Sequence, residues 1–395
     1  MPKLTNRWSV LALICVARFG MAVQFQSVPP VAPLLARDLD LSYSQIGTLI
    51  GVFMAPGVFI ALPGGLLGQR FGDKRVTMAG LALLTLGALL FAGATSFAVA
   101  FLARLVGGVG LVLLNTETTK MTTDWFSGKE TSTALGIMLT AWPLGIALSL
   151  STLGSLAAVT SWRAALYATS AFTAVALALL ALLYADPPPA GEAPAERRLW
   201  RITPRELALV GVIGTLWALI NAGYIVFLSF TPAMLLASGR SVGAAGVLVG
   251  LATWTAMAAI PLGGWIADRV RRIDVLIVGG ALLSTVAMVL ATTGVAVAAW
   301  MLLFGISGFW VPAIVALAGN TLSPAARHTG FGVFYTLFYG GMAVLPPVAG
   351  WLQDRTGSAV AALLFAAGIM VLGIPVLYLF RALERRLPRP ALPGA

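Results

Sequence analysis

The sequence predicts an all-α polytopic membrane protein whose twelve transmembrane helices form two pseudo-symmetric six-helix bundles. Of its 395 residues, 59% are hydrophobic and only 10% are charged, whereas soluble domains carry roughly 25% charged residues. The apolar residues are gathered in runs long enough to cross about 30 Å of hydrocarbon. In addition, a pattern from the first half of the chain recurs in the second half.

The predicted spans lie between polar or Gly/Pro-rich breaks, and each has about the 20 residues that a membrane-crossing helix needs. They cover residues 9–35, 43–66, 76–95, 98–119, 131–154, 162–185, 206–229, 243–265, 274–293, 296–318, 329–352 and 358–381. The first apolar run is too long for the core of a cleaved signal peptide, so we expect it to be retained as a span.

The widest polar gap divides the spans six and six. Its prolines and charges are typical of a linker. We therefore predict four parts: an N-terminal bundle (1–185), a cytoplasmic linker (186–205), a C-terminal bundle (206–381) and a cytoplasmic tail (382–395).

The two bundles carry the same sequence pattern, 199 residues apart. Gly64–Val76 reads GGLLGQRFGDKRV and Gly263–Val275 reads GGWIADRVRRIDV. The same offset pairs Pro33 with Pro232, Ser42 with Ser241, Gly47 with Gly246, and Gly51 with Gly250. Parallel internal repeats of this kind are typical of one large class of transporters.

The charges predict the orientation in the membrane. With the N-terminus in the cytoplasm, nineteen of the 25 lysine and arginine residues fall on the cytoplasmic side and four on the outer side. The positive-inside rule then places both termini in the cytoplasm of a bacterial cell, with the protein in the inner membrane. The net charge of +11 is accordingly a topology signal, and we expect no nucleic-acid partner.

The composition also excludes several kinds of chemistry. The single cysteine, Cys15, rules out a disulfide framework. No His/Cys/carboxylate cluster has metal-ligand spacing, and no phosphate-binding loop or nucleophilic triad can be assembled. We therefore predict neither a metal nor a cofactor, and no enzymatic activity.

Over nearly its whole length the chain resembles the major facilitator superfamily. The superfamily has a loop motif, Gly-x-Leu-x-Asp-Arg-x-Gly followed by basic residues, after spans 2 and 8. The matching residues are Gly65, Leu67, Arg70, Gly72, Lys74 and Arg75 in the first half, and Gly264, Asp268, Arg269 and Arg271 in the second. The resemblance implies that these loops tether helix ends and help to hold the outward-facing state. Gln69 stands where the motif has Asp, and it predicts a weaker first-half latch because its hydrogen bonds lack charge assistance.

The sequence of the first span, RFGMAVQFQSVPPVAPLL, resembles that of the cyanate permease and nitroimidazole-resistance branch of that superfamily. Span 4 matches a second superfamily pattern, Arg-x-x-x-Gly-x-Gly, at Arg104, Gly108 and Gly110. The resemblance links the arginine of this pattern to proton movement. From the residues themselves, a structural arginine bonded to a neighbouring helix and a contact with the substrate are equal alternatives, since the glycines permit close packing.

Arg18 is the sharpest candidate for a binding residue, because it lies about 15 Å deep in the first span. A charge at that depth costs roughly 2.5–3.5 kcal/mol and normally faces an interior cavity. Phe25 lies on the same helical stripe, and the 199-residue offset maps this stripe onto Trp217, Asn221 and Tyr224 of span 7. We expect these five residues to meet across a central pocket. Alternatively, Arg18 bonds a neighbouring helix and the aromatic residues only pack.

Further candidates are Gln26, which adds hydrogen-bonding capacity, and aromatic residues that either stack on a substrate or pack between helices. These aromatic residues are Trp142, Trp254, Trp310, Tyr335, Phe338 and Tyr339. Asn115 shares the stripe of Arg104 in span 4. Glu117 points away from that stripe and lies near the cytoplasmic end of span 4. We therefore interpret it as a charge at the membrane interface, and a role in coupling is the alternative.

By this reading none of the fourteen acidic residues lies at mid-membrane depth. Cation carriers and carboxylate proton relays need such an acid, so the charges predict an anionic substrate, a small carboxylate or a cyanate-like ion. Importing one negative charge alone against 100 mV costs about 2.3 kcal/mol. We therefore expect a secondary active transporter that works by alternating access, with proton coupling or exchange.

The alternative is an efflux pump of the same superfamily for drugs or amphipathic compounds, with a loose apolar pocket. A non-transporting scaffold would need a soluble domain, which the short linker and tail do not provide. The expected partners are the small-molecule substrate, the lipid bilayer and protons, and we expect a monomer.

Overall fold

The computed structural model describes residues 4–126, 130–186, 202–267, 269, 273–323 and 326–387. Within these ranges all regular structure is helical, and twelve helical stretches are long and apolar enough to cross a membrane, which confirms the predicted fold class. The helices are α1 (Arg7–Phe25), α2 (Val28–Leu39), α3 (Tyr43–Gly51), α4 (Pro56–Phe71), α5 (Asp73–Ala92), α6 (Phe97–Trp125), α7 (Thr131–Val159), α8 (Trp162–Leu183), α9 (Pro204–Ala237), α10 (Val242–Ala267), α11 (Ile273–Ala291), α12 (Val297–Ile306), the 3-10 turn η1 (Ser307–Trp310), α13 (Val311–Thr321), α14 (Arg327–Thr356) and α15 (Ala359–Arg386).

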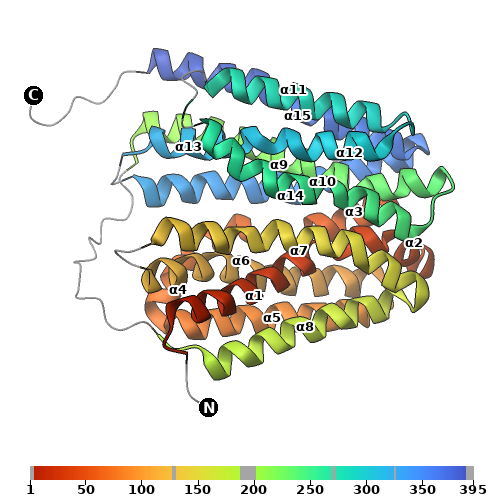
Figure 1. Cartoon of the computed structure of the whole chain (residues 1–395), viewed down its shortest axis with the longest axis horizontal. Coiled ribbons are helices and arrows are strands. Elements are labelled where there is room, and N and C mark those ends of the chain that lie inside the picture. The colour runs from red at the N-terminus through yellow and green to blue at the C-terminus, as the bar shows by residue number, and fades with distance from the viewer. Residues whose placement is uncertain are drawn as a thin grey trace, which may run out of the picture.

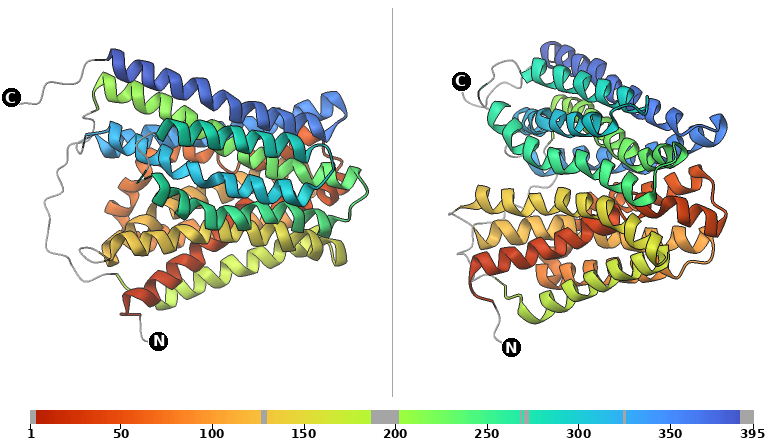
Figure 2. Two further views of the ribbon diagram at one scale, coloured as in Figure 1. Left: turned by 45° about the horizontal axis from the view of Figure 1, so that its top comes forward. Right: turned by 45° about the vertical axis from the view of Figure 1, so that its right-hand side comes forward.

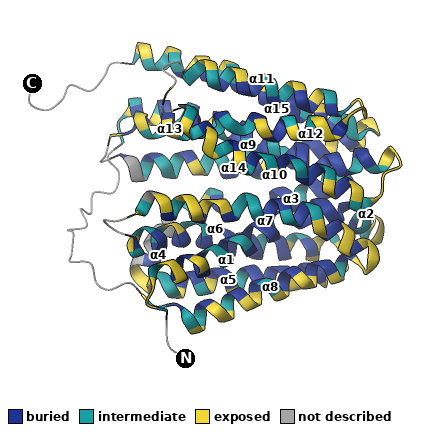
Figure 3. Ribbon diagram, in the orientation of Figure 1, coloured by how far each residue is buried: buried dark blue, intermediate teal, exposed yellow. Residues whose placement is uncertain are grey.

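The helices form two layers, α1–α8 and α9–α15, and both chain ends lie at the same end of the molecule (Figure 1). Most of the predicted linker, residues 187–201, lies outside the described residues, as does the tail beyond residue 387. α15 continues to Arg386, five residues past the predicted end of the second bundle. Exposed side chains lie mainly on the outward faces of the helices, and buried ones face the interior (Figure 3). Many exposed residues are large and apolar, such as Leu102 and Tyr378, as expected for a surface in contact with lipid.

Small residues allow helices to touch backbone to backbone inside the N-terminal half. Gly110 of α6 lies so close to α5 that a side chain at this position would clash with the backbone of Gly80 and Leu84. Gly108 lies against the backbone of Phe53 in the same way. The glycines of the Arg-x-x-x-Gly-x-Gly pattern are therefore close-packing positions.

Three predicted spans are interrupted: the first between α1 and α2, the second between α3 and α4, and the tenth by the 3-10 turn η1 between α12 and α13. The first break follows from Pro29 and Pro30, which open α2. Because proline has no N–H, these residues leave the carbonyls four residues earlier, those of Phe25 and Gln26, without their helical donors. Other side chains must therefore satisfy both carbonyls.

The halves pack against each other most extensively along two helix pairs, with further contacts between α4 and α14 and between α2 and α9; the first of the two pairs is α3 with α14. A Cβ added at Gly47 would meet the backbone of Pro346, and one at Gly51 would meet the backbone of Ala343. These glycines are therefore required for the closeness of the two helices.

The second pair is α7 with α10. Gly246 lies against the carbonyl of Leu150, and Gly250 lies against Ser151. Gly246 and Gly250 are the repeat partners of the two glycines in α3. We call the two helix pairs together the glycine seam. The seam involves the ends of the helices farthest from the termini, and in the right panel of Figure 2 the halves converge at that end.

An ionic cap joins the halves at the same end. Asp354, near the end of α14, accepts hydrogen bonds from the N–H groups of Tyr43 (2.8 Å) and Ser44 (2.7 Å). These are the first residues of α3, whose positive dipole end favours a carboxylate. The C-terminal half thus caps a helix of the N-terminal half.

We expect Asp354→Asn to open this end, because asparagine offers one oxygen without charge. The loss of about 1 kcal/mol corresponds to roughly a fivefold shift in the ratio of closed to open molecules. Spin labels at Thr160→Cys and Arg355→Cys, in a Cys15→Ser background, report the distance across this end by pulsed electron paramagnetic resonance. Asp38→Asn is the matched control, since Asp38 pairs with Arg163 inside one half. An unchanged distance distribution in Asp354→Asn would contradict the role of the cap.

Candidate functional site

Arg18 lies on α1 about 16 Å from the start of the helix, and only 6% of its surface is exposed. Its Nη1 donates to the hydroxyl of Thr118 on α6 at 3.3 Å, and its Nε has no partner among the residues that the structure describes. The titratable groups that face it are Cys15, on its own helix, and Tyr335 and Tyr339 of α14. None of the ion pairs between described residues includes Arg18. It is therefore a buried cation with spare donor capacity that faces the opposite half.

The surroundings of Arg18 form a polar group that spans both halves. Asn115 of α6 donates from its amide to the hydroxyl of Tyr339 at 3.2 Å. Tyr335 faces the buried Arg18, yet 37% of its surface is exposed, so it borders a space between the halves. We call Arg18, Asn115, Thr118, Tyr335 and Tyr339 the central cluster.

Gln26 lies at the break between α1 and α2. Its surface is completely buried, and within the described ranges neither polar atom of its side-chain amide has a hydrogen-bond partner. The hydroxyl of Ser149 donates to its backbone carbonyl at 2.9 Å, which replaces the bond lost to Pro30. A buried amide without partners is expensive, and it is available to a bound molecule.

Arg104 is saturated by protein partners, in contrast to Arg18. Its Nη1 donates to the carbonyl of Gln24 at 2.7 Å, its Nη2 to that of Phe25 at 3.1 Å and its Nε to that of Leu49 at 2.9 Å. Its guanidinium also lies 3.8 Å from the ring centroid of Phe53. Of the two alternatives that the sequence left open, this geometry is that of a structural arginine, which bonds carbonyls at and beside the break of the first span.

The aromatic candidates in the first half form a stack. Phe25 is 1% exposed, and its ring centroid lies 5.3 Å from that of Trp142 in α7 and 6.3 Å from that of Phe53. Phe25 therefore belongs to the packed interior of the N-terminal half, and the half-buried Trp142 covers it.

The span 7 candidates contact residues of their own half. Trp217 stacks on Phe334 with 5.7 Å between centroids, and its indole N–H has no partner. Asn221 donates to the carbonyl of Trp217 at 2.8 Å. Tyr224 stacks on Phe304 with 5.3 Å between centroids. From the second half, Tyr339 of α14 accepts a hydrogen bond from Asn115 of α6, and Tyr335 and Tyr339 are the titratable groups of that half that face Arg18, so α14 lies opposite the central cluster.

The remaining tryptophans differ in burial. Trp254 is 37% exposed at the glycine seam, where its Nε1 donates to Ser151 at 3.4 Å. Trp310 is 1% exposed and packs against Gly280 of α11, inside the C-terminal half. The burial of Trp310 favours the packing alternative for that residue.

Among the described residues, the first copy of the loop motif joins two helix ends, because Lys74 at the start of α5 donates to the carbonyls of Ala181 (3.0 Å) and Tyr184 (2.9 Å) at the end of α8. Gly72 joins α4 to α5 at φ +88°, which explains the glycine there. The Arg70 guanidinium lies over Phe71, and Arg269 donates to the carbonyl of Trp265 at 3.1 Å. Each arginine therefore contacts its own helix end. Gly264 of the second copy lies against Pro312. Asp268 and the side chain of Gln69 lie outside the described part, and so do the surroundings of Gly65.

The interpretation of Glu117 as an interfacial charge is wrong, because its surface is completely buried. In the part of the chain that the structure describes, neither of its carboxyl oxygens has a hydrogen-bond partner. A Cβ added at Gly68 of α4 would lie 2.5 Å from one Glu117 oxygen and 2.7 Å from the other, so the missing side chain makes room for the carboxyl group. No pattern in the sequence indicates that α4 covers this face of α6.

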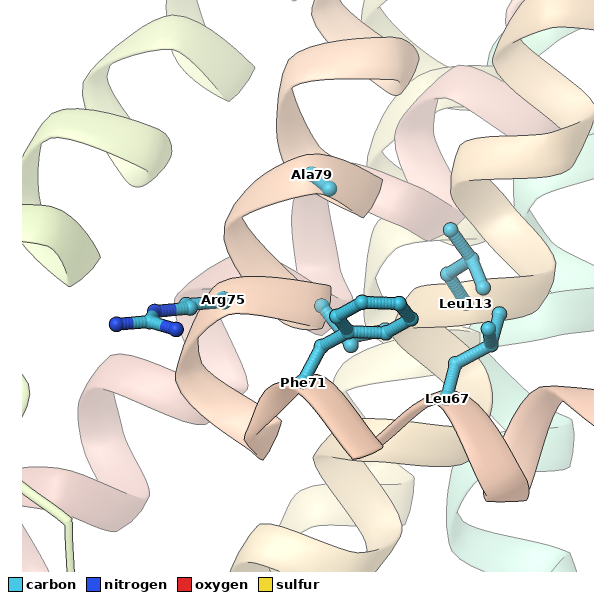
Figure 4. Close-up of a pocket in the computed structure, with 6 residues that line it drawn as sticks. Leu67, Phe71, Arg75, Ala79 and Leu113 are labelled. Carbon is cyan, nitrogen blue, oxygen red and sulfur yellow. The ribbon is translucent and has the colours of Figure 1, made fainter. Parts of the chain in front are cut away.

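One surface recess lies close to the loop motif, between α4, α5 and α6. It encloses about 330 Å³ and is lined by Leu67, Phe71, Arg75, Val76, Ala79 and Leu113. Figure 4 shows that the Arg75 side chain points away from Phe71 and Leu67. The recess contains no residue of the central cluster, and its lining is apolar apart from Arg75, so it is not the candidate substrate site.

Comparison with known proteins gives a consistent picture. The family model described as Major Facilitator Superfamily matches residues 14–238 and 218–394. The 3-(3-hydroxy-phenyl)propionate transporter of Escherichia coli (strain K12) is 29% identical over 90% of this chain and 89% of its own length. A probable sulfoacetate transporter of Cupriavidus necator is 24% identical over the same shares. The quinolone resistance protein NorA of Staphylococcus aureus is 28% identical over 40% of this chain and 41% of its own.

Solved structures share the fold. A bacterial homologue of the human lysosomal transporter Spinster, described as inward-facing and occupied, matches with a TM-score of 0.76 at 16% identity and covers 98% of this chain and 100% of its own. A point mutant of the nucleoside transporter NupG also matches with a TM-score of 0.76, at 15% identity over 96% of this chain and 100% of its own. At these identities the similarity supports the arrangement of the helices and nothing finer.

Proposed function

This chain belongs to the major facilitator superfamily, and from that membership we propose that it is a secondary transporter of small organic anions that works by alternating access. The observation that carries the proposal is Arg18, a buried guanidinium with one protein hydrogen bond and an unpartnered Nε. A buried charge without a counter-charge is unfavourable. A substrate carboxylate supplies the missing charge and accepts hydrogen bonds from the free N–H groups.

The central cluster supports this role, because it lies where the halves face each other. Tyr335 and Tyr339 come from the second half, while Arg18, Asn115 and Thr118 come from the first. An anion held by Arg18 would therefore also contact hydroxyl donors of the opposite half. The unpartnered amide of Gln26 and the indole N–H of Trp217 are further buried donors for a larger substrate.

The relatives agree with an anionic substrate. The names of the two that cover most of the chain denote transport of a propionate and of sulfoacetate, which carry carboxylate or sulfonate groups. An aromatic acid also suits a site whose cross-half residues include Tyr335 and Tyr339. The resemblance to the cyanate permease branch adds cyanate to the candidates.

The closed glycine seam indicates the state of the transport cycle. If both termini are cytoplasmic, as the positive-inside rule predicts, the seam and the Asp354 cap close the outer end and the structure is inward-facing. Transport then requires the seam to part while the cytoplasmic ends come together. Bringing in an anion with a proton, or in exchange for another anion, avoids the membrane-potential term of about 2.3 kcal/mol per charge.

Uptake by purified protein in liposomes tests the proposal. We expect accumulation of at least one of 3-phenylpropionate, sulfoacetate and cyanate, and competition among anions of similar size. We expect no transport of ethidium, because a cation would have to approach Arg18. Protein-free liposomes are the control. Transport of ethidium, with no response to any anion of a broad carboxylate and sulfonate panel, would overturn the proposal.

Drug efflux is the second candidate, because the chain resembles NorA over 160 residues and its aromatic side chains offer apolar surface. Efflux predicts resistance to several unrelated compounds in cells that express the protein. It also predicts that resistance does not depend on Arg18.

A further inference from the structure

A second buried charge lies on the same turn of α6 as the central cluster but on a different face. Glu117 is completely buried, and neither of its carboxyl oxygens has a hydrogen-bond partner among the described residues. The Glu117 carboxyl group lies against Gly68 of α4. The Asp73 carboxyl group lies against the same glycine, since a Cβ built at Gly68 would be 2.7 Å from Asp73 Oδ1. Asp73 is also within hydrogen-bonding reach of Glu117.

Two carboxyl groups in contact cannot both keep a negative charge at little cost, since neither can donate a hydrogen bond to the other. The charged groups that face Glu117 are Asp73 from α5, and Lys120 and Asp124 from its own helix; α4 contributes Gly68, which has no side chain. Lys120 donates to Asp73 Oδ1 at 2.5 Å. The lysine therefore balances the charge of Asp73, and that of Glu117 is left without a partner.

We propose that Glu117 and Asp73 form a proton-binding site and that a proton shared between their carboxyl oxygens is the coupling ion of transport. The coupling role, but not the proton site itself, rests on the proposed transport function. The proton comes from the aqueous side and binds a carboxylate oxygen, so the bound pair keeps one negative charge, which Lys120 balances. The bound proton also supplies the hydrogen-bond donor that the pair lacks.

The site is accessible from the end of the molecule that carries the termini. The Asp73 side chain is 18% exposed and that of Lys120 is 38% exposed, while Glu117 lies behind them. Protons can therefore reach the buried carboxyl group through Asp73 in the conformation seen here.

The helix α6 connects the proton site to the central cluster. Asn115 contacts Tyr339 and Thr118 contacts Arg18, while Glu117, between them in sequence, faces α4. Loss of the proton places two negative charges between α4 and α6 and favours their separation. Because the same turn of α6 contacts Arg18 and the opposite half, that movement changes the position of the anion-binding groups.

The proton site is tested without any substrate. We expect the infrared spectrum of the purified protein in detergent to show a protonated carboxyl band that titrates with pH. The band is expected to disappear in Glu117→Gln and in Asp73→Asn, each checked for folding by gel filtration. Asp124→Asn is the matched control, since Asp124 is exposed on the same helix, and it is expected to keep the band. A band that persists in both Glu117→Gln and Asp73→Asn overturns the site.

The coupling role is tested in liposomes with whichever anion the wild type accumulates. Glu117→Gln is expected to keep anion exchange within about threefold of wild type while its pH-driven accumulation falls by about tenfold or more. Full pH-driven accumulation in this variant overturns the coupling role. If the wild type transports no anion, the proposed function fails, whereas the infrared result still decides the proton site.

Discussion

Replacing Arg18 by glutamine is expected to reduce anion uptake by roughly a hundredfold, because the substrate would lose its only buried positive partner in the central cluster. Charged hydrogen-bonded pairs of this kind contribute about 2–5 kcal/mol to binding, and about 2.7 kcal/mol corresponds to a hundredfold. Initial rates of uptake in liposomes, at equal amounts of reconstituted protein, measure the effect.

The controls separate charge from packing. Thr118→Val removes the single protein partner of Arg18 and keeps the charge, so we expect less than a tenfold loss, in line with about 1 kcal/mol for one hydrogen bond. Gel filtration should show Arg18→Gln as a folded protein, since Arg18 makes only one hydrogen bond of 3.3 Å. Wild-type uptake of an anion by folded Arg18→Gln would remove this residue from the binding site.

Replacing Arg104 by leucine is expected to destabilise the protein severely, although Arg104 is as deeply buried as Arg18. The substitution removes the side-chain donor from the carbonyls of Phe25 and Leu49 at the broken helices, while the carbonyl of Gln24 keeps the hydroxyl of Ser27 as a donor. Buried unsatisfied carbonyls cost about 1–3 kcal/mol each, so we expect a loss of about 3–5 kcal/mol and a fall of roughly 10 °C in the unfolding midpoint.

Thermal unfolding of the purified variants in detergent, followed by tryptophan fluorescence, checks this result. Arg104→Lys is the graded control, because a lysine can reach some of the three carbonyls but lacks the planar fork of arginine. Arg18→Leu is the positional control, and we expect it to lose far less stability than Arg104→Leu. Equal loss in the two variants would mean that the hydrogen bonds of Arg104 do not determine stability.

The sequence predicted the fold well, because membrane-spanning helices leave a signal in the length of apolar runs. All twelve spans are confirmed, and the 199-residue repeat identified four glycines that the structure places in the contact between the halves. Helix ends were less predictable. The span of α9, for example, continues to Ala237, since amphipathic and polar flanks extend helices beyond the hydrocarbon region.

The contacts of the candidate site residues were harder to predict from the sequence than the fold. Depth along a helix can be counted, and it correctly marked Arg18 as buried. Which helix covers a given face depends on tertiary packing, so the partners of Arg104 and the burial of Glu117 could not be derived. Pro29 and Pro30 were the available clue for Arg104, because they free carbonyls that some donor has to satisfy.

The glycine seam has a kinetic consequence. When two surfaces pack through long side chains, each closing has to order the rotamers of those side chains again. This ordering costs up to about 2 kcal/mol for each large side chain. At Gly47, Gly51 and Gly246 no such side chain exists on one partner and main-chain atoms lie against each other directly, while Gly250 meets the short side chain of Ser151. The outer gate can therefore part and re-form with little entropic resistance, so turnover should be limited by occupation of the central site.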